Sequence, residues 1–266
     1  MIKVASSRHW FWFSSLSFCL VLLPLLLAMG AFSSYLGQAQ WLIYMTDAYT
    51  WRVVWFSWWQ ACLSTVISLS AAVLVSRALA RRQSFVGRWL LLRCFSVALV
   101  VPSIIAVFGI ILLHGKFGYF NQFWLWLGGQ PQSYVYGLTG ILLAHVFFNL
   151  PLATRILLQR LDAINAETWR LSSQLGMTSV DLWRHIEWPH IKGVLPQLAA
   201  LVFALCFTSF AIVMTLGGGP KATTIEVAIF QAIRFDFDIA KAVYLSLLQM
   251  GFCGFILWAG LRLGKP

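Results

Sequence analysis

Six apolar stretches divide this chain of 266 residues, and each is long enough to cross a bilayer as a helix. A helix rises about 1.5 Å per residue, so about 20 apolar residues cross the roughly 30 Å hydrocarbon core. The stretches lie near residues 12–32, 53–76, 95–113, 134–153, 194–216 and 242–261, and none of them contains Asp or Glu. With 60% hydrophobic and 10% charged residues, the chain has too little polar surface for a soluble globular protein. The sequence therefore predicts an all-α membrane protein with six transmembrane helices.

The basic residues between these stretches indicate which side of the membrane each loop occupies. Most of them fall before the first stretch, in alternate loops and after the last stretch: Lys3, Arg8, Arg77, Arg81, Arg82, Arg88, Arg93, Arg155, Arg160, Arg170, Arg184, Lys192, Arg262 and Lys265. Because cytoplasmic loops are enriched in Lys and Arg, we expect both termini and the long 157–193 loop in the cytoplasm. This topology accounts for most of the formal net charge of +11, so we expect no nucleic-acid partner.

The first apolar stretch has two interpretations. Lys3, Arg8 and the small residues at 28–31 fit a cleaved signal peptide, whereas the aromatic start at 10–13 makes the stretch longer than a usual signal core. We expect a retained anchor. The five cysteines lie in or near the predicted spans without C-x-x-C spacing, so we expect no metal site, no disulfide and no cofactor.

The ionisable residues in the predicted spans limit the classes of membrane protein to which the chain can belong. Carriers coupled to protons or sodium usually need carboxylates at mid-membrane depth, and the predicted spans have none. Motifs for catalysis such as H-E-x-x-H or G-x-S-x-G are also missing, so we do not expect an enzyme. If a substrate moves uphill, the energy must come from another polypeptide.

Four polar residues are expected to face the interior of the bundle, because lipid would leave them unpaired. They are His145 and Asn149 in the fourth span and Thr208 and Ser209 in the fifth. They could line a translocation path, or they could simply form hydrogen bonds between helices. Pro102 and Pro151 are expected to kink or end helices near such a path.

The 157–193 loop is predicted to contain two short helices joined at Gly176 in the left-handed conformation. Asn165 or Thr168 can cap the first helix, and Thr178 or Ser179 can cap the second, which Pro189 is expected to close. Ile164, Leu171 and Leu175 give the first helix an apolar stripe. Such a hairpin could transmit the push of a partner protein, or it could lie on lipid headgroups through Trp169, Trp183 and Trp188.

The same loop resembles the cytoplasmic loop of bacterial binding-protein-dependent ABC permeases, whose pattern is E-A-A, three residues, G, nine residues, I-x-L-P. Gly176, Ile186 and Pro189 match this spacing, while Arg170-Leu171-Ser172 replaces E-A-A and Trp188 replaces the leucine. The resemblance implies the six-span fold of importer permeases of the MetI-like type and a loop that docks on an ATPase subunit. The implied docking residues are Glu167, Arg170, Leu171, Ser172, Gly176, Met177, Ile186 and Pro189.

A second segment, residues 207–238, is similar to the thiamine-transporting subgroup of these permeases and to its ferric-iron relatives. The resemblance is carried by the run L-G-G-G-P, followed by T-T-I-E-V-A-I-F-Q. It implies an importer of thiamine or its phosphates with two cytoplasmic ATP-binding subunits, a periplasmic substrate-binding protein and a second permease half, either a fused repeat or another copy. The alternatives are a ferric-iron permease and a membrane scaffold that transports nothing.

From the residues alone, the glycine run is predicted to form a periplasmic gate. Gly217, Gly218, Gly219 and Pro220 end the fifth apolar stretch abruptly. Thr223 or Thr224 can then cap an amphipathic segment that extends to Arg234. The run lacks the G-x-x-x-x-G-K-[ST] pattern of a phosphate-binding loop, so we expect a structural role.

Overall fold

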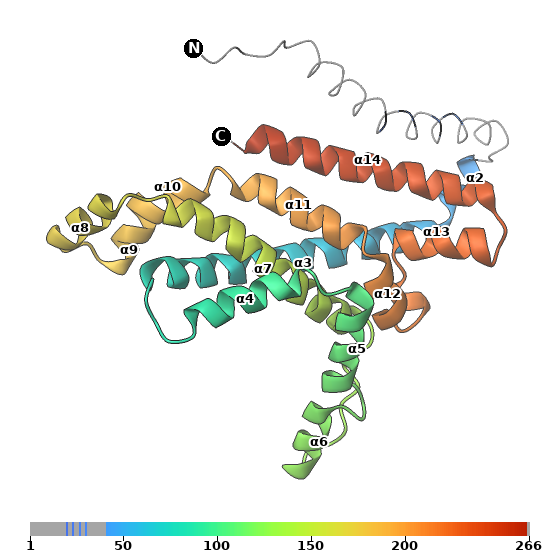
Figure 1. Cartoon of the computed structure of the whole chain (residues 1–266). Coiled ribbons are helices and arrows are strands. Elements are labelled where there is room, and N and C mark those ends of the chain that lie inside the picture. The colour runs from blue at the N-terminus through green and yellow to red at the C-terminus, as the bar shows by residue number, and fades with distance from the viewer. Residues whose placement is uncertain (1–19, 21–22, 24–26, 28–29, 31–40, 265–266) are drawn as a thin grey trace.

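A computed structural model of the chain describes residues 20, 23, 27, 30 and 41–264. The regular structure of the described residues is helical, as predicted, and the expected first span at 12–32 lies outside them apart from the four isolated positions (Figure 1). The α-helices are α2 (Trp41–Thr46), α3 (Ala48–Arg81), α4 (Arg88–Ala98), α5 (Ser103–His114), α6 (Tyr119–Trp126), α7 (Leu138–Asp162), α8 (Ala166–Gln174), α9 (Ser179–Leu182), α10 (Trp188–Ile191), α11 (Leu195–Phe207), α12 (Phe210–Leu216), α13 (Ile225–Arg234) and α14 (Ile239–Leu263). A π-helical turn, η1 (Trp183–Glu187), joins α9 to α10, and a 3₁₀ turn, η2 (Pro220–Ala222), precedes α13.

Helices α3 and α7 form the centre of the bundle. The buried side of α3 is a row of small residues that recur every three or four positions, which places them on one face. This row consists of Ser57, Ala61, Ser64, Ser68, Ala72 and Ser76, each fully buried. Small side chains let two helix backbones approach closely, and this packing is a main source of helix association in membranes.

Helix α11 lies against this centre, and α14 lies against α11 (Figure 1). Trp58 of α3 packs against Phe203 of α11 and Phe252 of α14, with ring centroids 5.0 and 5.4 Å apart. Near the other end of the α11–α14 contact, a Cβ atom on Gly260 would meet the Cβ of Ala200 at 2.4 Å, so the two helices touch there. Aromatic rings and a glycine contact together hold α14 on the bundle.

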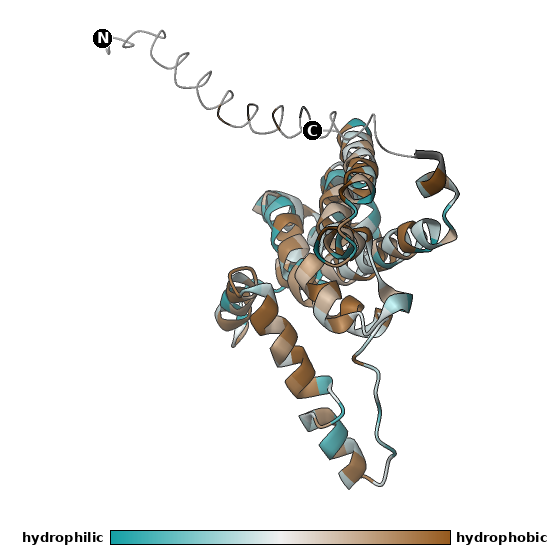
Figure 2. Cartoon of the chain, turned by 90° about the vertical axis from the view of Figure 1, so that its right-hand side faces the viewer, coloured by the Kyte–Doolittle hydropathy of each residue, from teal (hydrophilic) through white to brown (hydrophobic). Residues whose placement is uncertain are grey.

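Helices α5 and α6 form an arm that points away from the bundle (Figure 1). The hydropathy colouring shows that much of this arm is apolar (Figure 2). Ile104, Ile105, Phe108 and Leu112 of α5 are all exposed. Lipid or another protein must cover such a surface in the membrane.

Two of the predicted spans are broken helices. In 95–113, α4 ends at Ala98 and α5 begins after Pro102, because proline lacks the N–H that would continue the helix. In 194–216, α11 ends at Phe207 and α12 begins after Ser209. There the hydroxyls of Thr208 and Ser209 donate to the carbonyls of Ala204 and Cys206, a local alternative to helical hydrogen bonding.

Two other prolines, Pro151 and Pro189, do not end helices. Pro151 lies inside α7, which continues to Asp162, so the loop after it begins later than residue 157. Pro189 was expected to close the second loop helix, but the helical path continues through it to Ile191. The π turn explains this difference, because Trp188 N–H donates five residues back to Trp183 and the missing N–H of Pro189 falls beside that wider turn.

Among the described residues, four continuous or nearly continuous helical segments are long and apolar enough to cross a membrane. They are α3, α5 with α6, α7 and α14. A fifth candidate combines Ser179–Ile191 with α11, at an angle of 64°. The α3–α4 loop, the α8–α10 segment and the C-terminal end of α14 gather at the left of Figure 1, whereas α13 lies at the opposite end.

Candidate functional site

A neutral polar network lies at the centre of the bundle around His145, which is 2% exposed. Its Nδ1 lies 2.8 Å from Ser64 Oγ on α3, and its Nε2 lies 2.7 Å from Ser209 Oγ at the break before α12. The Ser209 hydroxyl donates its hydrogen bond to the carbonyl of Cys206 at 2.9 Å, so its oxygen accepts a hydrogen bond from His145 Nε2–H. Nδ1 then accepts from Ser64. This order fits an uncharged imidazole that links three helical segments.

Two further side chains hold the break after α11. Gln60 Nε2 donates to the carbonyl of Cys206 at 3.0 Å, and Asn149 Nδ2 donates to Cys206 Sγ at 3.2 Å. A helix end inside a membrane leaves carbonyl groups unpaired. Gln60 supplies a donor to one of these carbonyls, whereas Asn149 bonds the Cys206 thiol. Gln60 was not among the residues predicted from the sequence. Its signal was the polar row Ser57, Gln60 and Ser64 at helical spacing within one apolar stretch.

A cavity of about 330 Å³ lies beside the network. His145 and Asn149 contribute polar atoms to its wall. The other lining residues are Leu99, Val101, Ser103, Phe148, Leu152, Leu205 and Ile212. Both helix breaks border the cavity, which is mostly apolar with a few polar groups, as small-molecule sites usually are.

Of the four polar residues expected inside the bundle, Thr208 lies elsewhere. Its side chain is exposed, and its hydroxyl donates to the carbonyl of Ala204 at 2.9 Å in its own helix. The expectation that an outward hydroxyl would remain unpaired was therefore wrong for Thr208. His145, Asn149 and Ser209 are brought together.

The segment α8, α9, η1 and α10 forms a helical hairpin at one end of the molecule (Figure 1). Asn165 is the N-cap residue of α8, without a side-chain bond to it. Gly176 has a φ of +63°, the left-handed conformation predicted for the turn. Thr178 caps α9 in a capping box with Asp181. The Thr178 hydroxyl donates to the Asp181 carboxylate and holds the pKa of that group below its usual value.

The tip of the hairpin exposes apolar side chains. Leu171 is 57% exposed, Leu175 is 76% exposed and Val180 is 70% exposed, whereas Ile164 of the predicted stripe is buried in the core. Among the other residues proposed for docking, Glu167, Arg170, Gly176 and Pro189 are exposed, Met177 is half-buried, and Ser172 and Ile186 are buried. The tip therefore offers a small apolar surface with charged neighbours.

An ion-pair cluster fixes the hairpin to α3, and the sequence analysis missed it. The Glu187 carboxylate is fully buried and accepts from Arg77 Nε at 2.7 Å and from Arg81 Nε at 2.5 Å. Arg77 also stacks over the Trp183 ring at 4.2 Å, and Arg81 donates to Ser179 Oγ at 2.6 Å. We call Arg77, Arg81 and Glu187 the arginine clamp. The sequence places Arg77 and Arg81 four positions apart, on one face of a helix, but it does not mark Glu187 as their partner.

The glycine run forms a tight loop at the opposite end. Gly217 ends α12, and Gly218 and Gly219 have φ values of +71° and +129°, which side chains rarely adopt. A Cβ on Gly217 would come within 2.5 Å of the Val213 carbonyl oxygen. After the loop, Ile225 N–H at the start of α13 donates to Ser57 Oγ of α3 at 2.9 Å. The loop thus turns the chain abruptly and docks α13 on α3.

These features are those of a membrane-embedded helical bundle that carries an exposed hairpin at one end. Residues 66–260 match the model of the binding-protein-dependent transport system inner membrane component family, and the chain belongs to that family. It is a multi-pass inner-membrane protein.

The thiamine transport system permease proteins ThiP are similar to this chain. The protein of Salmonella typhimurium is 50% identical over 225 residues, which cover 85% of this chain and 42% of that protein. The Escherichia coli protein is 48% identical over 228 residues, covering 86% and 42%. A putative ferric transport system permease protein, FbpB 1 of Haemophilus influenzae, is 25% identical over 228 residues, covering 82% and 35%. The chain spans about 42% of the length of these ThiP relatives.

A solved structure shares the fold. The chain superposes on a subunit of a bacterial alginate ABC transporter, crystallised in complex with an alginate pentasaccharide-bound periplasmic protein, with a TM-score of 0.83. The match covers 95% of this chain and 93% of that chain at 12% sequence identity. At this identity the likeness concerns the fold alone.

Proposed function

We propose that the chain forms one half of a permease that imports thiamine or its phosphates under the action of two ATP-binding subunits. Identity of 50% to a thiamine permease, against 25% to a ferric one, supports thiamine over iron as the substrate. A periplasmic binding protein delivers the substrate. The coverage of 42% of the ThiP relatives supports a second half that completes the path.

The observation that carries this proposal is the hairpin, which is exposed at its apolar tip and anchored at its base. Leu171, Leu175 and Val180 present the surface on which an ATP-binding subunit docks. The arginine clamp transmits the motion of that subunit, because the hairpin cannot move far without α3. A loop that merely rested on lipid would have no need of a buried carboxylate between two arginines.

The contacts of α3 extend this proposal to the substrate path. Ser64 contacts His145, and it lies on the same face of α3 as Ser76, the neighbour of the clamp residue Arg77. Movement of α3 would therefore alter the Ser64–His145–Ser209 bonds beside the cavity. We take the cavity as part of the path and the glycine loop with α13 as its periplasmic gate.

We further propose six spans with both termini cytoplasmic. The arginine-rich α3–α4 loop, the hairpin and the end of α14 lie at one end of the molecule, which agrees with the positive-inside rule (Figure 1). In a background without native cysteines, a cysteine at Gln83 or Ser173 should be labelled only from the cytoplasm. A cysteine at Gln130 or Ala222 should be labelled only from outside, and labelling of position 173 from outside would refute the topology.

The test of the function is reconstitution of the full-length protein with its ATP-binding subunits and binding protein. Proteoliposomes should take up labelled thiamine only with ATP on the hairpin side, whether or not a pH gradient is imposed. Leu175→Glu should abolish stimulated ATP hydrolysis and uptake, while the matched Leu175→Met keeps an apolar tip and should retain both. Uptake driven by a gradient without ATP, or full activity of Leu175→Glu, would contradict the proposal.

A further inference from the structure

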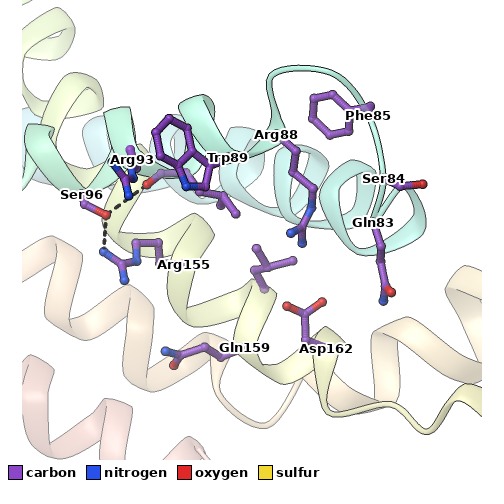
Figure 3. A pocket seen from close by; sticks show the side chains of 12 residues that line it. Gln83, Ser84, Phe85, Arg88, Trp89, Arg93, Ser96, Arg155, Gln159 and Asp162 are labelled. Atoms are coloured by element: carbon purple, nitrogen blue, oxygen red, sulfur yellow. Dashed lines mark hydrogen bonds between the residues drawn. The ribbon is translucent and has the colours of Figure 1, made fainter.

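A second cavity, of about 530 Å³, opens between the α3–α4 loop, α4 and the end of α7 (Figure 3). Its charged lining residues are Arg88 and Arg93 from α4, and Arg155 and Asp162 from α7. Three positive charges and one negative charge leave a net charge of +2 in the wall. The function of the hairpin and the cavity beside His145 do not use this site, which we call the arginine pocket.

Arg88 is the central observation. Its Nε atom is buried and has no hydrogen-bond partner, and no acidic residue among those described lies within ion-pair distance of it. In Figure 3 its guanidinium points into the space between α4 and α7. A buried donor without an acceptor is costly, and no protein group supplies an acceptor for this Nε–H. An anionic group in the pocket would supply the missing acceptor.

The two other arginines are held in place by neighbours. Arg155 Nη1 donates to Ser96 Oγ at 2.9 Å, and Arg93 lies over the Trp89 ring at 3.6 Å from its centroid. Each guanidinium carries five N–H donors, so both retain donors for a ligand. The planar fork of guanidinium donors matches the oxygens of a phosphate group, which makes arginine suited to phosphate recognition.

The surroundings of the pocket indicate where the phosphate comes from. Two exposed aromatic side chains line the pocket, Phe85 at 43% and Trp89 at 62% exposed, and their sequence neighbours Val86 and Leu90 are exposed as well. The pocket lies where α3 and α7 end, at the arginine-rich end of the bundle. Tryptophan at helix ends is typical of the headgroup level of a bilayer, and basic pockets between membrane helices suit anionic lipid headgroups. A soluble anion would have no use for these exposed apolar side chains.

We propose that the arginine pocket binds the headgroup phosphate of an anionic phospholipid from the adjacent leaflet. Arg88, Arg93 and Arg155 contact the phosphodiester, and the acyl chains lie along the exposed apolar side of α4. Asp162 accepts from the hydroxyls of a glycerol headgroup. This lipid ties α4 to α7 at the end of the bundle that carries the hairpin.

Native mass spectrometry of the detergent-purified full chain tests this proposal. Phosphatidylglycerol should bind more tightly than phosphatidylethanolamine, and Arg88→Gln should weaken phosphatidylglycerol binding about fivefold, the amount expected for one basic contact at a lipid surface. Arg82→Gln is the matched control, because Arg82 is an exposed arginine nearby that does not line the pocket, and this variant should bind like the wild type.

Further variants and a competitor keep the test decisive. Arg88→Gln removes an unpaired group, so its thermal midpoint should not fall, and Arg88→Lys, which keeps the charge without the fork, should bind at an intermediate level. Inorganic phosphate should not displace the lipid at millimolar concentration. Equal binding of both lipids, equal loss in Arg82→Gln, displacement by inorganic phosphate, or loss of the lipid when the ATP-binding subunits assemble would each overturn the proposal.

Discussion

The two joints that α3 makes with its neighbours use different chemistry. The arginine clamp joins it to the hairpin through a buried carboxylate and two guanidiniums, whose side chains are 21% and 26% exposed. The network around His145 joins it to α7 and to the break before α12 through uncharged groups. Charge is tolerated at the first joint because the guanidiniums reach the membrane surface, whereas charge in the apolar centre is expensive. The first joint therefore holds firmly, and the second can exchange its bonds at lower cost.

Loss of Glu187 should have the largest effect. Glu187→Ala leaves two partly buried arginines unpaired, which typically costs about 3–5 kcal/mol. We expect a lower thermal midpoint, lost association with the ATP-binding subunits and no uptake. Glu167→Gln is the control, since Glu167 is exposed and has no ion pair among the described residues, and it should remain near the wild type in stability.

Gly176→Val tests the hairpin without touching either joint. A β-branched residue at a φ of +63° is strained by about 1–3 kcal/mol. We expect normal membrane insertion but weaker stimulation of ATP hydrolysis by loaded binding protein. Gly251→Val places the same side chain in open space on α14 without a positive φ, so it should retain uptake. Wild-type uptake by Gly176→Val would remove the hairpin from the coupling mechanism.

His145→Gln should have a smaller effect, because a neutral hydrogen bond contributes about 0.5–1.5 kcal/mol net. Glutamine can keep one of the two bonds, so substantial uptake should remain and its pH profile should not change. A double-mutant cycle with Ser64→Ala should show coupling near that magnitude, while Thr208→Val should show none with Ser64→Ala. Abolition of uptake by His145→Gln would mean that the network around His145 is as necessary for uptake as the arginine clamp.

The smallest effect concerns the hairpin cap. The pKa of Asp181 is lowered from 3.8 chiefly by its bond from Thr178. A lowered folded-state pKa contributes stability that is present above the usual value and lost as pH falls through the lowered value. Amide exchange in α9 should therefore be faster in Asp181→Asn than in the wild type at neutral pH, and the difference should shrink as pH falls below the usual value of 3.8 and through the lowered pKa. A difference that persists unchanged at lower pH would contradict the cap.

Local features of the hairpin followed from the sequence, whereas long-range ones did not. The turn at Gly176 and the cap at Thr178 depend on residues within one or two helical turns, so their chemistry was readable. The arginine clamp joins residues 106 and 110 positions apart, and no local pattern states which arginine meets Glu187. Polar residues inside the spans could be named, but their partners depended on how the helices pack.

The helix breaks show a second limit. Hydropathy remains high through Val101 and Thr208, so a search for apolar stretches sees one span where the chain forms two helices. Pro102 indicates either a kink or a helix end, and the sequence does not decide between the two. At Thr208 the break depends on Gln60 of another helix, which holds the freed carbonyl of Cys206. The sequence of one apolar stretch cannot show that a residue of another helix stabilises a break in it.

Because of the π turn at Trp183–Glu187, the number of residues in the hairpin determines how its tip is oriented. A π turn accommodates one extra residue in a helix, and each residue in an α-helix rotates the chain by about 100°. Removal of one residue here would restore a regular helix but swing the tip through roughly a quarter turn or more relative to Glu187. The nine residues between Gly176 and Ile186 therefore set the direction in which the tip points. A change in the length of this segment would reorient the tip, whereas a change of side chain would not.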